Sequence, residues 1–174
     1  MKNKKTYKVT AKQENSKMCF VCGLTNNLGL KASFYETDKQ ELIAVFTPGQ
    51  AHQGYPGRLH GGIAAAILDE AIGRNINMNR DDQLWGVTVD FNIRFKKPIP
   101  LDKPLKTVTR LTKENRRFFE GSGEIVLDDG TIAATARGKY YKMPIKDIAS
   151  DFTMDSDDWK VVKTGQDPAR IDVP

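Results

Sequence analysis

The sequence lacks any long apolar segment. Its 174 residues contain no apolar run near the ~20 residues that a membrane-spanning helix needs. The first eight residues, MKNKKTYK, are charged and are followed by polar sequence, so the apolar stretch of a secretory signal is missing as well. We therefore expect a cytoplasmic protein without a membrane partner.

Cysteine is scarce, which limits the metal and redox chemistry that the sequence can support. The chain has two cysteines, Cys19 and Cys22, in a C-x-x-C spacing. A zinc site needs about four ligands. His52 and His60 could complete the set, but their spacing fits no common zinc motif, and no βαβ pattern surrounds the pair as in a redox motif. We expect a tight turn with two half-buried thiols, no metal ion and no cofactor.

The excess of one sign of charge is also small. The chain carries 27 Lys and Arg against 22 Asp and Glu, a net charge of +5. We expect most of these charges to be solvated surface. The phosphates of a nucleotide or of CoA are the next candidate partner, and polymeric nucleic acid is the last. The N-terminal lysines do not form a DNA-binding segment, so no nucleic-acid partner is expected.

The pattern of apolar residues predicts one domain built around a single helix. We divide the chain into a flexible basic N-terminal segment (1–17), a domain (18–145) and an acidic C-terminal tail (146–174). The expected strands are 30–35, 41–47, 85–95, 105–113, 117–127 and 131–143, and the expected helix is 60–78. Strict alternation in strand 85–95 predicts one shared face for Val87, Val89, Phe91, Ile93 and Phe95.

One helix cannot cover both faces of so many strands. The expected fold is therefore α+β, with a curved antiparallel β-sheet wrapped around one long central helix. A second subunit would cover the other face or an edge of this sheet.

The stretch GRLHGGIAAAILDEAIG is the most informative part of the chain. Gly61 and Gly62 open an apolar helix, whose free N–H groups and positive dipole end suit an anion or a developing oxyanion. Asp69 lies inside the apolar run, where a carboxylate costs free energy unless it is paired or used. An N–H donor and a carboxylate on one helix are groups that acyl-group hydrolysis requires. Glu70, by contrast, can form a surface ion pair with Arg74.

Three motifs resemble those of the hotdog-fold acyl-CoA thioesterases of the PaaI-like group. They are CFVCGLTNNLGL at 19–30, HQGYPGRLHGGI at 52–63 followed by LDEAIG at 68–73, and VTVDFNIRFKKP at 87–98. The resemblance covers about residues 19–143. It implies a homodimer or homotetramer whose active sites lie between subunits.

The resemblance also implies roles for individual residues. The carboxylate of Asp69 is expected to act as nucleophile or general base, and the N–H of Gly61 to polarise the thioester carbonyl. Thr88 is expected to orient water. Some relatives carry Asn or Gln where this chain has Gly54. The residues expected to contribute to acyl-CoA binding are His60, Gly62, Gln53, Arg58, Lys96 and Lys97.

Each of these residues also has a purely structural explanation. His60 could cap the helix, the paired glycines could serve close packing, and Asp69 could be a hydrogen-bonded core residue. Thr88 is a common strand residue, and the basic side chains could be solvated charges.

The preferred function is hydrolysis of a small, medium-chain or aromatic acyl-CoA to free acid and CoA. The alternative is a non-catalytic hotdog module that binds acyl-CoA as a sensor, and the carboxylate of Asp69 argues against it. A hydratase comes last, because His60 and Asp69 lie about two helical turns apart. The sequence does not choose between attack by Asp69 and deprotonation of water.

Overall fold

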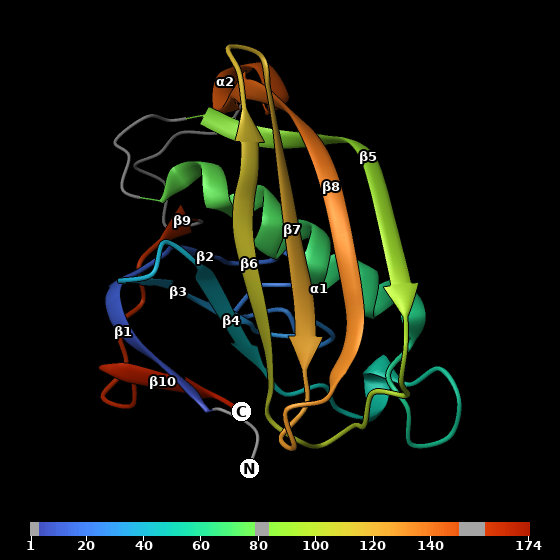
Figure 1. The fold of residues 1–174 in the computed structure, drawn as a ribbon. Helices are drawn as coiled ribbons and strands as arrows, with labels where there is room; N and C mark the ends of the chain where they lie inside the picture. Colours follow the sequence, from blue (N-terminus) through green and yellow to red (C-terminus); the bar gives the residue numbers. More distant parts are fainter. Residues whose placement is uncertain (1–3, 79–83, 150–158) are drawn as a thin grey trace.

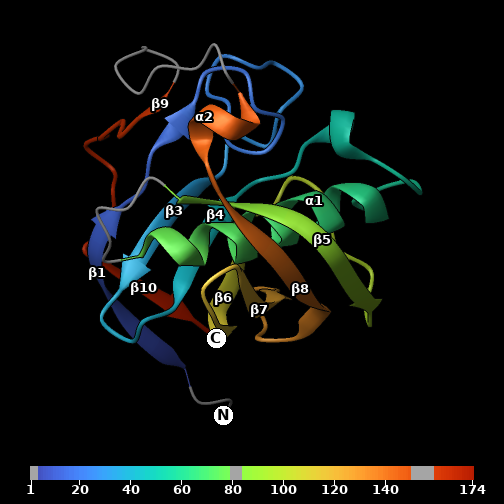
Figure 2. The ribbon, with the colours of Figure 1, turned by 90° about the horizontal axis from the view of Figure 1, so that it is seen from above.

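The fold is a curved sheet around one helix, as predicted. The computed structural model describes residues 4–78, 84–149 and 159–174. Eight antiparallel strands form one sheet in the order β10-β1-β3-β4-β6-β7-β8-β5, and α1 packs along its concave side (Figures 1 and 2). The short pair β2–β9 lies outside this sheet. No helix within these described ranges is long and apolar enough to cross a membrane.

The strands follow the predicted hairpins closely. Strands β3 to β8 correspond to the six strands that the sequence predicts. The strands are β1 (Lys5–Lys12), β2 (Asn15–Ser16), β3 (Ser33–Thr37), β4 (Leu42–Phe46), β5 (Leu84–Phe95), β6 (Leu105–Glu114), β7 (Phe118–Val126), β8 (Ile132–Pro144), β9 (Trp159–Lys160) and β10 (Arg170–Val173). The helices are η1 (Gln50–His52), α1 (Gly61–Gly73), η2 (Arg74–Asn77) and α2 (Ile145–Ile148).

The central helix is held by an apolar face and by a cap at its first turn. Its buried residues follow the i, i+3, i+4, i+7 and i+8 pattern of one helix face and are Ala64, Ile67, Leu68, Ala71 and Ile72. Nδ1 of His60 accepts the N–H of Gly62 at 3.0 Å, so the imidazole caps the helix N-terminus. The last turn, η2, is a 3₁₀ turn. The predicted helix 60–78 is thus confirmed, with a change of helix type near its end.

The sequence predicts a flexible N-terminal segment, but the structure forms a paired strand there. β1 pairs with β3 on one side and with β10 on the other. Tyr7 of β1 is 2% exposed and belongs, with Ile171 and Val173, to an apolar cluster separate from the core around α1. The prediction for residues 1–17 is therefore wrong from Lys5 onward, because a strand 165 residues away completes its pairing. In the predicted tail 146–174, β10 likewise joins the sheet, and Trp159 packs against the core around α1.

A bulge in β5 decides where Thr88 points. Thr88 is paired with Tyr140 of β8, and Phe91 is paired with Gly138. Cross-strand partners share a face of the sheet, and residues two apart on β8 lie on the same face. Thr88 and Phe91 therefore both face α1, because Val89 is the extra, bulged residue between them. The predicted strict alternation is wrong here: the two valines of β5 do not share the face of Phe91.

Candidate active site

The carboxylate of Asp69 accepts hydrogen bonds from two strands. Thr88 Oγ1 donates to Oδ1 and Oδ2 at 3.0 and 3.2 Å, and Tyr140 Oη donates to Oδ1 at 3.0 Å. Burial raises the pKa of Asp69, while the donors Tyr140 and Thr88 act against this rise. The carboxylate is thus fixed in position and has a pKa above its ordinary value. The structure brings together the predicted pair, Asp69 and Thr88.

Sequence reasoning missed Tyr140. Its ring is 1% exposed and stacks on Phe119 with centroids 4.9 Å apart. Burial, together with the nearby charge of Asp69, raises the pKa of Tyr140, so the phenol stays protonated as a donor. A Cβ at Gly138 would lie 2.4 Å from Oη of Tyr140, so this glycine leaves room for the hydroxyl. The signal was available, because a buried tyrosine hydroxyl needs a polar partner.

A cavity of about 290 Å³ opens beside Asp69. Its lining includes the aromatic rings of Trp85, Tyr140 and Trp159. Asn77 also lines it, and its Oδ1 is buried with no hydrogen-bond partner among the described residues. This cavity joins apolar walls with a few polar groups, as small-molecule sites do.

Gly61 lies at the other end of the helix. It borders a separate cavity of about 440 Å³, and no described residue accepts a hydrogen bond from its N–H. A Cβ at Gly61 would lie 3.3 Å from the ring of Phe95, so the end of β5 packs on this glycine. Asp69 comes eight positions after Gly61, which is about 12 Å along a helix. Within one chain, the structure does not bring these two predicted site residues together.

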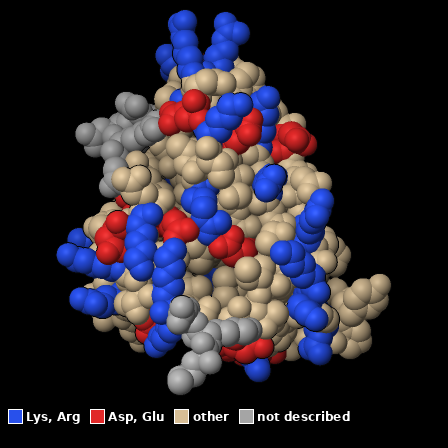
Figure 3. All heavy atoms as spheres, in the orientation of Figure 1, with Lys and Arg blue, Asp and Glu red and all other residues tan. Residues whose placement is uncertain are grey.

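Three predicted basic residues surround the Gly61 cavity. Arg58, Lys96 and Lys97 all line it, and Arg58 is exposed. Figure 3 shows that Lys and Arg side chains gather along the side of the molecule on which β5 and β8 lie in Figure 1. Arg58, Lys96 and Lys97 thus place positive charge at the wall of the cavity that Gly61 borders.

The remaining predicted residues shape the loop before the helix. Gln53 Oε1 accepts the N–H of Gly57 at 2.7 Å, and Gly57 has the positive φ of 71° that favours glycine. A Cβ at Gly54 would lie 3.0 Å from Cα of His60, so the backbone packs tightly there. His60 is the helix cap, and Gly62 donates to it. These contacts give the loop residues structural roles.

Glu70 forms the predicted ion pair, but the pair is not on the surface. Arg74 Nη2 lies 2.8 Å from Oε1 of Glu70, and Arg74 is only 6% exposed. Its guanidinium lies over the rings of Phe34 and Trp159, at 4.2 and 4.9 Å from their centroids. The surface assignment is therefore wrong, because aromatic rings enclose the cation.

The two cysteines lie beside Glu70. Both are free thiols, Cys22 being fully buried and Cys19 partly buried in the lining of the Asp69 cavity. A hydrogen bond from the Cys22 thiol lowers the pKa of Cys19, while the same bond and burial raise that of Cys22. The expected tight turn is confirmed by the hydrogen bond from Gly23 N–H to Cys19 O at 2.8 Å. Cys22 is more buried than expected.

Comparison with known proteins agrees with this geometry. Residues 56–134 match the family model of the thioesterase superfamily. Acyl-coenzyme A thioesterase THEM4 from Bos taurus is 30% identical over 126 residues, which cover 71% of this chain and 51% of that protein. The chain spans about half the length of the curated relatives that it matches.

Solved structures of thioesterases share the fold. A crystal structure of a thioesterase superfamily protein aligns with a TM-score of 0.64 at 25% identity, covering 71% of this chain and 59% of that one. The PaaI protein of E. coli aligns with a TM-score of 0.59 at 19% identity, covering 66% of this chain and 80% of that one. The sheet wrapped around one central helix thus defines a hotdog fold. Segment 56–134 of this chain is similar to the thioesterase superfamily.

Proposed function

We propose that the protein hydrolyses acyl-CoA thioesters to a free acid and CoA, with a small, medium-chain or aromatic acyl group. The observation that carries this proposal is the carboxylate of Asp69, which Thr88 and Tyr140 hold at the wall of a cavity. Curated relatives named acyl-coenzyme A thioesterases support the same activity. The free thiols of Cys19 and Cys22 fit the reducing cytoplasm that the sequence predicts.

Two routes are compatible with this carboxylate. Asp69 can attack the thioester carbonyl, so that the C–S bond breaks, CoA leaves as thiolate and water hydrolyses the mixed anhydride. Alternatively, Asp69 deprotonates a water that Thr88 orients, and the hydroxide attacks the same carbon. A thiolate is a good leaving group, so neither route requires a strong general acid.

The proposed oxyanion donor, Gly61 N–H, has to come from a second copy of the chain. A thioester carbonyl cannot contact Asp69 and Gly61 of one helix, because they lie about 12 Å apart. β5 is an edge strand on which Val89 and Phe95 are 54% and 55% exposed. Such an edge is suited to pairing with a second chain.

A two-fold axis at this edge would complete two sites. Within one chain, Thr88 of β5 contacts Asp69, and Phe95 near the end of β5 packs against Gly61. Antiparallel pairing of two β5 strands centred between these positions brings Asp69 of one chain to Gly61 of the partner subunit, and the reverse. We therefore propose a homodimer as the minimal active unit, which can assemble further into a homotetramer.

The border of the Gly61 cavity is suited to the CoA phosphates. Arg58, Lys96 and Lys97 would meet them there, while the thioester reaches the Asp69 cavity of the adjoining subunit. The aromatic lining of that cavity is the proposed acyl pocket. Charge-assisted contacts of this kind position a phosphate without taking part in the chemistry.

The test is release of CoA thiol from a panel of short, medium-chain and aromatic acyl-CoAs. Wild type is expected to turn over at least one substrate, and Asp69→Asn to lose that turnover while staying folded. Asp128→Asn is the matched control, because it removes an exposed carboxylate of the turn between β7 and β8, outside the Asp69 cavity and away from β5. If wild type binds acyl-CoA and releases no thiol, the proposal fails and the protein is an acyl-CoA-binding module.

A further inference from the structure

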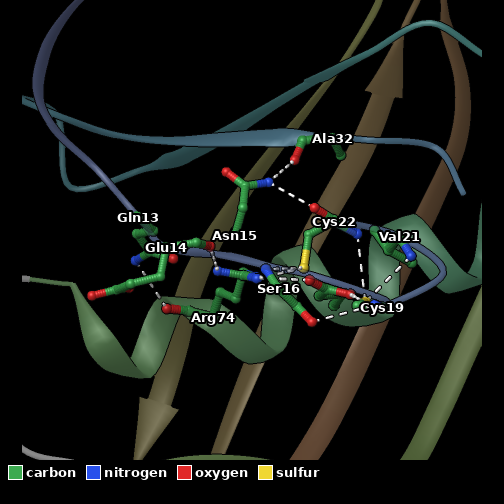
Figure 4. A network of polar contacts seen from close by, with 10 residues as sticks. Gln13, Glu14, Asn15, Ser16, Cys19, Val21, Cys22, Ala32 and Arg74 are labelled. Carbon is green, nitrogen blue, oxygen red and sulfur yellow. Dashed lines mark hydrogen bonds and ion pairs between the residues drawn. The ribbon is translucent and has the colours of Figure 1, made fainter. Parts of the chain in front are cut away.

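The cluster of Cys19, Cys22 and Glu70 lies outside the proposed reaction and has the donors of a metal site. One ligand atom of each residue, two sulfurs and one oxygen, lies within 4.8 Å of the others. The two sulfurs come from a turn that lies over α1 (Figure 4). The carboxylate of Glu70 comes from α1, 51 residues away along the chain from Cys19. The sequence could not indicate this third donor, because it is remote from the C-x-x-C motif.

Both sulfurs already accept several N–H hydrogen bonds. The backbone N–H groups of Val21 and Cys22 point at Cys19 Sγ, at 3.3 and 3.4 Å. The backbone N–H of Ser16, at 3.4 Å, and Nη2 of Arg74, at 3.2 Å, point at Cys22 Sγ. A neutral thiol is a weak acceptor, whereas a metal-bound thiolate makes good use of such outer donors. Four donors on two sulfurs therefore fit thiolate ligands.

The carboxylate is oriented with one oxygen toward the sulfurs. Arg74 Nε and Nη2 hold Oε1 of Glu70, at 3.0 and 2.8 Å. Oε2 is 3.2 Å from Cys19 Sγ. A metal ion between the sulfurs and Oε2 would leave the ion pair with Arg74 intact. The guanidinium then becomes an outer partner of two ligands, Glu70 and Cys22.

The charges of the cluster balance with or without a divalent ion. With both thiols protonated, Glu70 and Arg74 form a neutral pair. Binding of one divalent cation releases the two thiol protons, so two thiolates compensate the two positive charges and the cluster stays neutral. The site therefore contains no uncompensated charge in either state. An uncompensated charge would cost free energy here, because Cys22 is 0% exposed.

We propose that Cys19, Cys22 and Glu70 bind one Zn²⁺ ion, with a fourth position open to the Asp69 cavity. Thiolate ligands select zinc over Mg²⁺ or Ca²⁺, and three protein ligands with one open position are a known zinc arrangement. Cys19 and Glu70 both line that cavity, which gives solvent access to the fourth position. The ion would link the 19–23 turn to α1, next to the proposed catalytic carboxylate.

Metal content of the purified, reduced 174-residue chain tests the site without any reference to activity. After equilibration with zinc and dialysis, about one zinc per chain is expected by elemental analysis. Substitution by Co²⁺ should produce thiolate-to-metal charge-transfer absorption. Since the chain has only two cysteines, this absorption reports on Cys19 and Cys22 alone.

Matched variants distinguish the ligands. Cys19→Ser and Cys22→Ser should each weaken zinc binding at least tenfold and alter the cobalt spectrum. Glu70→Gln should weaken binding at least tenfold while the thiolate absorption remains, whereas Asp69→Asn, one residue away, should bind zinc as wild type does. Reduced wild type that retains neither ion overturns the proposal, as does unchanged zinc binding in Glu70→Gln. Disulfide formation with hydrogen peroxide, in a protein that binds no metal, would instead identify a redox pair.

Discussion

Mixing two inactive variants tests the shared active site most directly. The first variant is Asp69→Asn, which removes the carboxylate. The second is Gly61→Pro, which removes the unused N–H. Proline is tolerated at the first position of a helix, and His60 before it has φ −63° and ψ 135°, the extended conformation that a residue before proline prefers.

The expected magnitudes follow from the geometry. Loss of one oxyanion donor lowers kcat about 10²- to 10³-fold, so each homodimeric variant should keep about 1% of wild-type activity or less. A heterodimer of the two variants has two active sites, and each site combines Asp69 of one chain with Gly61 of the other. One site therefore carries both changes, and the other carries neither. The purified heterodimer should therefore recover about half of wild-type activity, and a random 1:1 mixture about a quarter.

Co-expression of the two variants with different affinity tags, followed by two-step purification, yields the heterodimer. Thiol release is then compared among the heterodimer, both homodimers and wild type. Gly61→Ala is the control for shape, because it keeps the N–H and places a Cβ 3.3 Å from the Phe95 ring. It should stay far more active than Gly61→Pro.

The result that refutes the reasoning is a heterodimer no more active than its parents. In that case each site would use Gly61 and Asp69 of one chain, and every site in the heterodimer would carry one change. Heterodimers of two differently tagged Asp69→Asn chains should show no recovery. This control excludes an effect of the tags.

Three further predictions concern the supports of the site and of the fold. Gly138→Ala should lower the free energy of unfolding by about 1–3 kcal/mol through overpacking against Tyr140, whereas Gly165→Ala, with open space around its Cβ, should change the thermal midpoint little. Tyr140→Phe should lower kcat on the order of tenfold with little change in KM, because it removes a donor to the general base or nucleophile, Asp69. Burial favours a raised pKa for Glu41, but three hydrogen-bond donors on β1 and β6 outweigh it and hold this pKa below its ordinary value. Glu41→Gln should therefore destabilise the protein at neutral pH. The difference from wild type in thermal midpoint should shrink as pH falls below the ordinary glutamate pKa of about 4.3 and on through the lowered pKa of Glu41, where the folded wild type takes up the proton.

The parts of the fold that could be predicted, the central helix and the hairpins, follow from local sequence patterns. The helix from Gly61 follows from an apolar run behind a glycine pair, and the hairpin at Gly130 follows from its Asp-Gly turn. β1 could not be predicted this way, because its sequence is polar and its order depends on β3 and on the remote β10. The buried state of Arg74 was equally out of reach, since Phe34 and Trp159 enclose it from distant parts of the chain.

The bulge in β5 shows how a site can differ from the pattern that predicts it. Strict alternation puts Thr88 on the face opposite to Phe91, away from the helix. The one extra residue, Val89, turns Thr88 toward Asp69 while Phe91 still packs on the core. The resemblance predicts Thr88 as a site residue, and the structure places its hydroxyl on the carboxylate of Asp69, whereas periodicity predicts the opposite orientation. A bulge adds a residue to one strand only, so it is defined by the partner strand β8, and no periodicity within 84–95 can reveal it.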